Sequence, residues 1–518
     1  MDRKELFVPG RLCILGEHSD WAGANRIVNG EIAEGMAIVS GIEQGIHAWI
    51  EKSADFEVIS EVNHLSFKEK MNVEALRAVA AEGQFFSYMA GTASYIKEHY
   101  HVGGVKITID EITLPIKRGL SSSAAICVLV AKAFNILYGL NMSTLGIMQA
   151  AYRGELRTPS RCGRLDQACA YGVKPVVMTF DGSDVDVKQL SVQGDFYWVF
   201  ANLNASKDTV KILADLGRCY PFAQTELERR VHEALGKKNQ EIISRAIKLF
   251  ECGDAEAMGA FLTEAQNLFD AQVAPACMEE LEAPILHGIL NDDYVKSLTY
   301  GGKGVGSQGD GTVQFLAKDE QTQAELIRYL TDEKKMEAYK FTIHRQKKVK
   351  KAIIPVAGFG TRVYPETRGV RKEFFPVVDK DGLIKPALLT LLEELDKAGI
   401  EEICLVIGKG DKEIYRNYFE KPLEWEHFQK LPDNMKEYEK KILRIGQKIH
   451  YAVQEERQGF GHAVFQCREF TDGQPVLLLL GDTLYSSNTN SSCVEQLLEA
   501  YEKTDHLHGL RQYGLFFV

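Results

Sequence analysis

Two loops rich in small residues place the strongest constraint on this chain. Residues 115–125 read Pro-Ile-Lys-Arg-Gly-Leu-Ser-Ser-Ser-Ala-Ala and lead into an apolar helical run. Residues 355–373 include Ala-Gly-Phe-Gly-Thr-Arg and follow a short apolar strand. Small residues let backbone N–H groups approach phosphate oxygens, and a helix N-terminus adds a favourable dipole. Neither loop fits the pattern G-x-x-x-x-G-K-[ST], so the chain is not an ordinary P-loop ATPase. The pair of loops predicts two successive phosphate reactions.

Composition narrows the class of protein. A chain of 518 residues with 45% hydrophobic and 26% charged residues is typical of soluble globular domains. The net charge of −11 argues against a nucleic-acid or membrane partner. The start has no apolar core of a signal peptide, no run approaches the roughly 18 residues that span a bilayer, and the ten cysteines are scattered. We therefore expect a cytoplasmic protein that acts on small molecules; its oligomeric state is left open.

Strand-like and helix-like runs alternate along the chain, as in α/β or α+β folds. Residues 11–15 and 105–110 are expected to be strands. Residues 122–138 are expected to form a buried helix with one apolar stripe, Ala125, Leu129, Ala133 and Ile136.

Further along, charged helical stretches are expected at about 224–250 and 254–272, on either side of Gly253, a plausible helix stop. A strand-like cluster at 297–300 runs into a glycine-rich segment at 301–311.

A basic stretch at 344–351 marks the sharpest change in composition. Such a stretch is more typical of a solvated linker than of a phosphate site. A new strand-loop-helix pattern starts directly after it. The sequence therefore predicts domains at 1–346, with lobes at about 1–185 and 186–346, and at 347–518.

Three glycine-bearing segments precede residue 346: 9–23, 119–124 and 301–311. Each alone is more often a turn. In this order and spacing they resemble the GHMP kinase superfamily of galactokinase, homoserine kinase, mevalonate kinase and phosphomevalonate kinase, over about residues 5–340. The resemblance implies a two-lobed α+β fold, ATP as phosphoryl donor and Mg²⁺.

By this resemblance the serine-rich loop binds ATP and a nearby carboxylate helps to hold Mg²⁺, a cation that prefers oxygen ligands. The metal ligands would be Ser123 and Glu155, which lies eleven residues before Asp166. The ATP-binding residues would be Gly119, Leu120, Ser121, Ser122, Ser123 and Ala124.

The catalytic residues implied by the resemblance are Asp166, which would accept or orient the proton of the substrate hydroxyl, and Arg11 beside it. The surrounding Cys-Gly-Arg-Leu-Asp-Gln differs from the galactokinase-like pattern only in having Leu165 for methionine. Taken without the other motifs, Asp166 would be assigned to a helix cap rather than to catalysis.

Glu17, His18 and Asp20 match the Glu-His-x-Asp-Tyr motif with which galactokinase-like kinases hold sugar hydroxyls, except that Trp21 replaces tyrosine. Two carboxylates and an imidazole supply the acceptors and donors that a sugar needs. The alternative for His18 is a buried histidine with internal partners. Lys303 and Asp310 depart from the family's small residues and could contact substrate or form a salt-bridged turn.

From about residue 350 the chain resembles bacterial glucose-1-phosphate uridylyltransferase and related sugar-nucleotide pyrophosphorylases, so we expect an α/β Rossmann-like domain. Its metal ligand would be Asp482, and UTP its nucleotide. The expected nucleotide-binding residues are Gly358, Gly360, Thr361, Arg362 and Lys372 at the phosphates and Gln454 and Gly459 at the base. A plain strand-to-helix turn is the alternative for residues 358–362.

Complete members of that second family continue for over a hundred residues beyond the position of Asp482, whereas this sequence ends at Val518. Sheet edges and apolar faces would then stay uncovered. We therefore expect an incomplete domain with weak or no nucleotidyl transfer.

Together these motifs predict an ATP-dependent sugar or sugar-acid kinase that makes a sugar 1-phosphate, fused to a UDP-sugar-forming domain. The alternatives are that uridylyl transfer is the main activity, or that the chain is a non-catalytic sugar and ATP sensor. A mevalonate-type substrate suits Glu17, His18 and Asp20 less well than a sugar does.

Overall fold

The computed structural model describes residues 3–114, 122–160, 162–205, 207–345, 349–456, 458–489, 491–503 and 516–517. The chain divides into two compact units, one up to Arg345 and one from Gln346 onward. Within the described ranges no helix is both long enough and apolar enough to cross a bilayer. All ten cysteines are free thiols.

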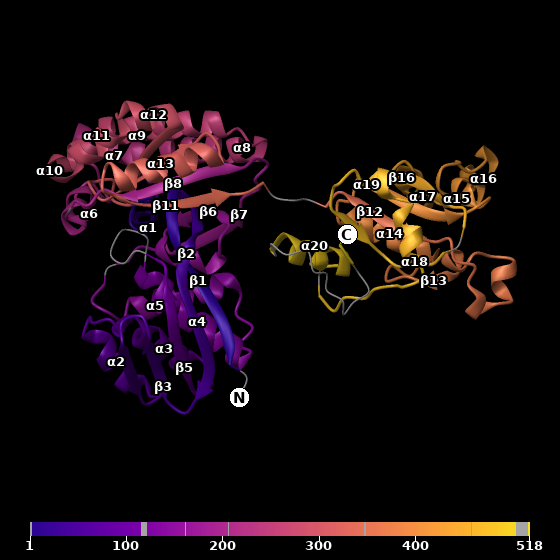
Figure 1. Cartoon of the computed structure of the whole chain (residues 1–518), viewed down its shortest axis with the longest axis horizontal. Helices are drawn as coiled ribbons and strands as arrows, with labels where there is room; N and C mark the ends of the chain where they lie inside the picture. Colours follow the sequence, from indigo (N-terminus) through magenta and orange to yellow (C-terminus); the bar gives the residue numbers. More distant parts are fainter. Residues whose placement is uncertain are drawn as a thin grey trace. The chain divides into compact units, whose positions relative to one another are not determined.

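A seven-stranded sheet forms one lobe of the first unit (Figure 1). Its long strand β2 pairs with β1 along one of its edges. Along the other edge, one part of β2 pairs with β5 and another part pairs with β6. Only β3 and β5 run parallel. The strands are β1 (Lys4–Leu15), β2 (Gly35–Ser53), β3 (Phe56–Ser60), β4 (Leu65–Glu69), β5 (Gly104–Ile112), β6 (Pro175–Asp181) and β7 (Asp184–Gln189). The predicted strands at 11–15 and 105–110 are confirmed.

Helices pack against this sheet, and the two together form one buried apolar core. They are α1 (Ser19–Ala24), α2 (Val73–Ala81), α3 (Ser87–His99), α4 (Ser122–Tyr138) and α5 (Thr144–Glu155), with the 3₁₀ turns η1 (Asn25–Ile27) and η2 (Asp166–Tyr171). The buried helix predicted at 122–138 is confirmed as α4. Its stripe is wrong at one end, because Ile136 is exposed while Ala125, Leu129 and Ala133 are fully buried.

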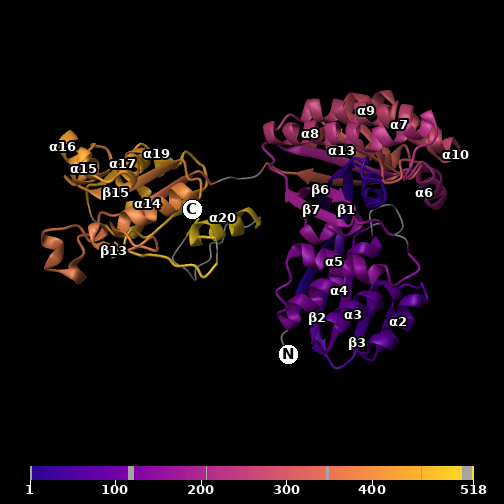
Figure 2. The same ribbon diagram turned by 180° about the vertical axis from the view of Figure 1, so that it is seen from behind.

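The second lobe is an antiparallel sheet with the order β11-β8-β10-β9. Both views show its helices gathered on one side of the sheet (Figures 1 and 2). The strands are β8 (Phe196–Asn202), β9 (Thr299–Val305), β10 (Thr312–Ala317) and β11 (Glu337–Ile343). The helices are α6 (Thr209–Gly217), α7 (Glu226–Leu235), α8 (Lys237–Cys252), α9 (Ala255–Gln272), η3 (Ala274–Cys277), α10 (Met278–Leu281), α11 (Pro284–Leu290), α12 (Asp293–Leu298) and α13 (Glu320–Asp332).

Two local predictions in this lobe were wrong in detail. The helical stretch at 224–250 is two helices, α7 and α8, because the backbone leaves helical geometry at Gly236. Residues 297–298 end α12, and the strand starts at Thr299 and continues through Gly301, Gly302 and Gly304. Gly253 does end α8, in the left-handed conformation that glycine tolerates best.

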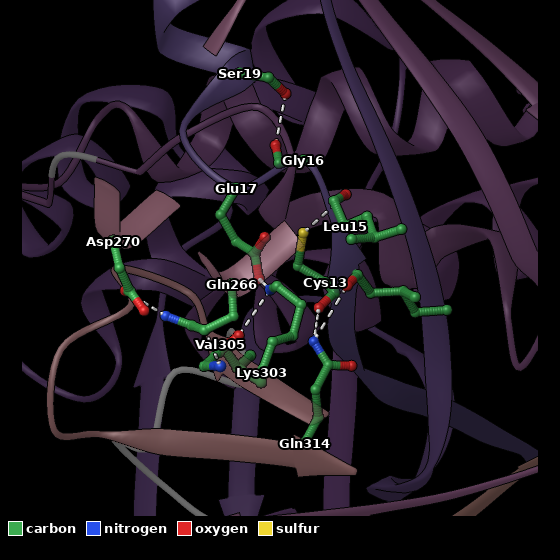
Figure 3. A network of polar contacts seen from close by, with 12 residues as sticks. Cys13, Leu15, Gly16, Glu17, Ser19, Gln266, Asp270, Lys303, Val305 and Gln314 are labelled. Carbon is green, nitrogen blue, oxygen red and sulfur yellow. Dashed lines mark hydrogen bonds and ion pairs between the residues drawn. The ribbon is translucent and has the colours of Figure 1, made fainter. Parts of the chain in front are cut away.

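Buried polar contacts join the two lobes behind the end of β1 (Figure 3). Nζ of Lys303, on β9, lies 2.6 Å from Oε1 of Glu17 and also donates to the carbonyl of Gly304. Both charged side chains are at most 5% exposed. Nε2 of Gln314, on β10, donates to the carbonyls of Cys13 and Ile14 at 3.0 and 3.2 Å. These contacts fix the end of β1 against the second sheet.

The second unit is built on the sheet order β16-β15-β12-β17-β18, parallel except for β18. Its strands are β12 (Lys351–Pro355), β15 (Glu402–Gly408), β16 (Ile449–Gln454), β17 (Val476–Leu478) and β18 (Phe516–Phe517), with the separate hairpin β13 (Pro376–Val378) and β14 (Ile384–Pro386). The helices are α14 (Ala387–Lys397), α15 (Lys412–Phe419), α16 (Trp425–Gln429), α17 (Asp433–Gly446), α18 (Phe460–Phe465), α19 (Arg468–Thr471) and α20 (Cys493–Lys503), with the turns η4 (Thr361–Val363), η5 (Glu366–Arg368) and η6 (Lys372–Phe374).

We predict that Lys303→Met lowers the free energy of unfolding of the first unit by about 3–5 kcal/mol, because it leaves the Glu17 carboxylate buried without its cation. Urea unfolding followed by tryptophan fluorescence measures this, since Trp21, Trp49 and Trp198 lie in this unit. The control, Lys248→Met on the exposed side of α8, should stay within about 0.5 kcal/mol of the parent protein. Equal stability of the two variants would contradict the prediction.

Candidate active site

A cavity of about 1070 Å³ opens in the first unit, and the predicted motifs meet there. That volume is at the upper end of the range typical of small-molecule sites. The cavity wall is formed by the end of β1, the loop and helix after it, the start of α4, the segment before η2, and two segments of the second lobe. Those two segments follow β8 and precede β10, and they contribute Asn202, Lys207, Thr209, Gly306, Ser307 and Gly311.

Arg11 and Asp166 form an ion pair in the cavity wall. A register shift in β1 between Pro9 and Arg11 interrupts the regular pairing with β2 there, and such irregularities re-aim side chains. Nη2 of Arg11 donates to Oδ1 of Asp166. Nε and Nη1 of Arg11 are buried with no hydrogen-bond partner among the described residues, so the guanidinium has donors left for an anion.

Asp166 is the first residue of η2, and the N-cap residue before it, Leu165, makes no side-chain hydrogen bond to the turn. The carboxylate instead lies against Arg11 on the cavity wall.

Glu155 ends α5 and is fully buried. Nε2 of Gln167 donates to its Oε2 at 2.8 Å, while its Oε1 has no hydrogen-bond partner among the described residues. Burial, followed by repulsion from Asp166, raises the pKa of Glu155 to about 7, although Ser123, Gln167 and Cys162 act in the opposite direction. A buried carboxylate oxygen that lacks a donor, close to a serine hydroxyl, fits a hard cation such as Mg²⁺.

The described residues contain no cluster of three or more His, Cys, Asp or Glu side chains that could hold a metal.

Only part of the predicted ATP-binding loop lies within the described residues. Gly119, Leu120 and Ser121 lie outside the described residues. Ser122 and Ser123 line the cavity at the first turn of α4, and Ala124 is buried behind them.

The loop after β1 brings Glu17, His18 and Asp20 to the cavity wall. It turns at Gly16, whose φ of +93° suits glycine and whose added Cβ would meet the Met36 carbonyl oxygen at 2.3 Å. Oε1 of Glu17 forms the ion pair with Lys303. Burial and then repulsion from Asp166 raise the pKa of Asp20, which accepts a long hydrogen bond from the backbone N–H of Leu165.

His18 is held in one orientation by Trp21. Nε1 of Trp21 donates to Nδ1 of His18 at 3.2 Å, and His18 has a left-handed φ of 69°. Nε2 of His18 is buried, and the described residues provide no hydrogen-bond partner for it. Burial lowers the pKa of His18 to about 4, and Lys207 and Lys303 add to this shift. The imidazole is therefore neutral at physiological pH, with its proton on Nε2.

Sequence reasoning missed several cavity residues, chiefly Lys207 and Asn202 from the second lobe and Phe85 and Tyr88 from the first. None belongs to a motif, and only the fold brings them to the cavity. Trp21 departs from the galactokinase-like motif, but the motif does not predict its contact with His18.

In the second unit the predicted residues lie beyond the carboxyl ends of parallel strands, where α/β sheets bind ligands. Lys372 Nζ lies 2.7 Å from Oδ2 of Asp482, and this contact lowers the pKa of that carboxyl. Gly360 has a φ of 74°, and an added Cβ there would stand 3.5 Å from Lys372. Thr361 and Arg362 form η4 beside it, and the Arg362 charge also acts on Asp482.

The remaining residues of this group are placed less tightly. Lys372 also lies near Gly358, because a Cβ added at Gly358 would stand 3.6 Å from Nζ of Lys372. Gln454 ends β16 and donates to the carbonyl of Gly459 at 3.1 Å, so these two residues form a separate pair.

Comparison with known protein families assigns both units. Residues 87–173 match the family model for the GHMP kinases N terminal domain, and residues 351–509 match the model for nucleotidyl transferases. The first unit thus contains a GHMP kinase N terminal domain, and the second contains a nucleotidyl transferase domain. The first unit is called the kinase unit from here on, and the second the transferase unit.

The transferase unit is similar to UTP–glucose-1-phosphate uridylyltransferases. It is 36% identical over 174 residues to that of Staphylococcus epidermidis, covering 31% of this chain and 53% of the relative. It is 40% identical over 159 residues to that of Bacillus subtilis, covering 30% of this chain and 52% of the relative. The chain thus spans about half the length of these relatives.

The kinase unit shares its fold with two solved kinases at 17% identity. The Methanococcus jannaschii mevalonate kinase matches 66% of this chain and 98% of its own, with a TM-score of 0.52. The Lactococcus lactis galactokinase complexed with galactose matches 66% and 94%, also with a TM-score of 0.52. The predicted families and the predicted order, a two-lobed α+β kinase followed by an α/β nucleotidyltransferase, are confirmed.

We predict that Trp21→Phe abolishes the fixed tautomer of His18, because phenylalanine lacks the donor that occupies Nδ1. Nitrogen NMR of the histidine-labelled protein at pH 7 should show a single Nε2–H tautomer in the parent protein and a mixture in the variant. Trp49→Phe, at an exposed contact with Asp110, is the control and should leave His18 unchanged. A mixture of tautomers already present in the parent protein would contradict the assignment.

Proposed function

We propose that the kinase unit transfers the γ-phosphoryl group of ATP to a sugar or sugar acid, at the anomeric hydroxyl, and forms a sugar 1-phosphate. The observation that carries this proposal is the Arg11–Asp166 pair in a cavity that Glu17, His18 and Asp20 also line. A base, a cation and a set of groups that bind hydroxyls are the components that this reaction needs.

In the proposed step the sugar hydroxyl oxygen attacks the γ-phosphorus, the bond between that phosphorus and the β–γ bridging oxygen breaks, and ADP leaves. Asp166 accepts the hydroxyl proton. Arg11 pairs with Asp166 and offers its remaining N–H groups to the phosphoryl oxygens.

Ser123 and Glu155 are the residues that would hold Mg²⁺, and the backbone at 119–124 would bind the phosphates. When bound, Mg²⁺ supplies positive charge that neutralises phosphate oxygens. Gln167 orients Glu155 through its hydrogen bond to Oε2.

The sugar would be oriented by the loop after β1. His18 offers one N–H donor and Asp20 offers acceptors, and both are held by neighbouring groups. Support for a sugar comes from the galactokinase complexed with galactose, whose fold the kinase unit shares.

For the transferase unit we propose binding of UTP, with Gly358, Gly360, Thr361, Arg362 and Lys372 at the phosphates, Gln454 and Gly459 at the base, and Asp482 at Mg²⁺. The similar uridylyltransferases support this assignment. The kinase product, a sugar 1-phosphate, would be the co-substrate in formation of a UDP-sugar. Dominant uridylyl transfer, or sensing without catalysis, are the alternatives that the following experiments separate.

We predict that Asp166→Asn lowers kcat for sugar-dependent ADP release by about 100- to 10,000-fold, because it removes the general base, while ATP affinity changes less than about threefold. ADP release and ATP titration measure the two quantities over a sugar panel. The control is Asp186→Asn, at an exposed pair with Lys188. A sensor would release no ADP with any sugar, and an equal loss of both quantities would indicate a structural role for Asp166.

We predict that Lys372→Met weakens UTP binding at least about tenfold, because a charge-assisted contact to phosphate is lost. Titration calorimetry with UTP and Mg²⁺ on the full chain measures this. Lys409→Met, at an exposed pair with Glu455, should bind as the parent protein does. Pyrophosphate release from UTP and glucose 1-phosphate that exceeds sugar-dependent ADP release would instead favour uridylyl transfer as the main activity.

A further inference from the structure

Lys207 is a partly buried cation in the kinase cavity that belongs to no recognised motif. It follows β8, lines the cavity, and its Nζ lies 3.5 Å from the carbonyl oxygen of Val305. The glycine-rich segment before β10 leaves room for its side chain. An added Cβ at Gly311 would stand 2.5 Å from Lys207 Nζ, and one at Gly309 would stand 3.4 Å from Lys207 Cβ. The segment is thus shaped around this lysine.

Other charges near Lys207 already have partners. Lys303 pairs with Glu17, and Arg11 pairs with Asp166. Asp310 accepts hydrogen bonds from the backbone N–H groups of Ile285 and Leu286 at the start of α11. Among the described residues no carboxylate oxygen lies within 4.0 Å of Lys207 Nζ. A second polar group in the same segment, the Ser307 hydroxyl, is also buried without a hydrogen-bond partner in the described part of the chain.

Lys207 belongs to the sugar end of the cavity. Its charge, like that of Lys303, acts on His18, and Glu17 is the carboxylate that acts on it most strongly. At the end of the cavity where phosphoryl transfer is proposed, the positive charge comes from Arg11. The serine residues at the start of α4 mark the nucleotide side, and they belong to the other lobe.

We propose that Lys207 binds a carboxylate on the sugar, with the Ser307 hydroxyl as a second donor, so that the substrate of the kinase unit is a sugar acid. This inference rests on the proposed kinase function. One ammonium and one hydroxyl suit a carboxylate with a single charge, whereas a phosphate dianion usually takes several cationic or backbone donors. Withdrawing a charge from water is costly unless the charge is paired, and a carboxylate on the substrate would pair with the partly buried ammonium of Lys207.

The pH dependence of the reaction follows from burial. Burial lowers the pKa of Lys207 to about 8, while Glu17 and Asp310 oppose the shift. The ammonium is present below that pH and is lost as the pH rises through it. The kcat/KM for a sugar acid should therefore fall above pH 8 more steeply than that for the matching neutral sugar.

The test compares matched pairs, galacturonate with galactose and glucuronate with glucose, by coupled ADP release on the full chain. For the parent protein we expect kcat/KM to favour one of the two acids over its neutral partner by about 10- to 100-fold, the usual effect of a hydrogen bond to a charged group. Lys207→Met should lower that ratio by the same factor, mainly through KM. Lys211→Met, on α6 and paired with Glu279 near the surface, is the control and should keep the ratio.

Three outcomes would overturn the inference. A preference for both neutral sugars would refute it while leaving the kinase function intact. An equal fall of kcat for acid and neutral sugar in Lys207→Met would place Lys207 at the phosphoryl group instead. No ADP release with any sugar would refute the kinase function and this inference together. Titration of the acid into Lys207→Met and Lys207→Arg, with thermal unfolding as a check of folding, separates loss of the charge from misfolding: Lys207→Arg should retain binding and Lys207→Met should lose it.

Discussion

The buried ion pair between Glu17 and Lys303 is the interaction on which the kinase cavity depends. It links the loop after β1 in one sheet to β9 in the other, in a region where Gln314 also bonds to β1. Buried charges are tolerated only when they are paired and hydrogen-bonded, so the pair specifies how the lobes meet. The cavity residues from both lobes, among them His18 and Lys207, hold their positions because that junction is fixed.

Charge pairing also organises the chemistry of both units. In the kinase unit Arg11 balances Asp166, and in the transferase unit Lys372 balances Asp482. In each case the cation lies against a carboxylate that the proposed reaction would use. Trp21 has a comparable effect on a neutral group, because its indole N–H determines which nitrogen of His18 bears the proton.

How much the sequence could reveal depended on whether residues act within one contiguous motif. Arg11, Glu17, His18 and Asp20 were predicted because they lie along one segment, and Glu155 and Asp166 because a characteristic spacing relates them. Lys207 and the partner of Lys303 could not be predicted, because those contacts exist only when two sheets pack together. The predicted helix boundaries were wrong at Gly236 and Leu298, where a single backbone angle or a tertiary contact overrides local propensity.

The shared strand β2 has a consequence for how such a kinase unit can vary. Its 19 residues are hydrogen-bonded to β1 on one side and to β5 and β6 on the other. One residue inserted into β2 would turn the side chains after it to the opposite surface of the sheet. It would also shift the register of β2 with the strands on both of its edges. Insertions and deletions in related chains should therefore be absent from β2 and collect in turns such as 61–64, where no ladder has to be re-registered.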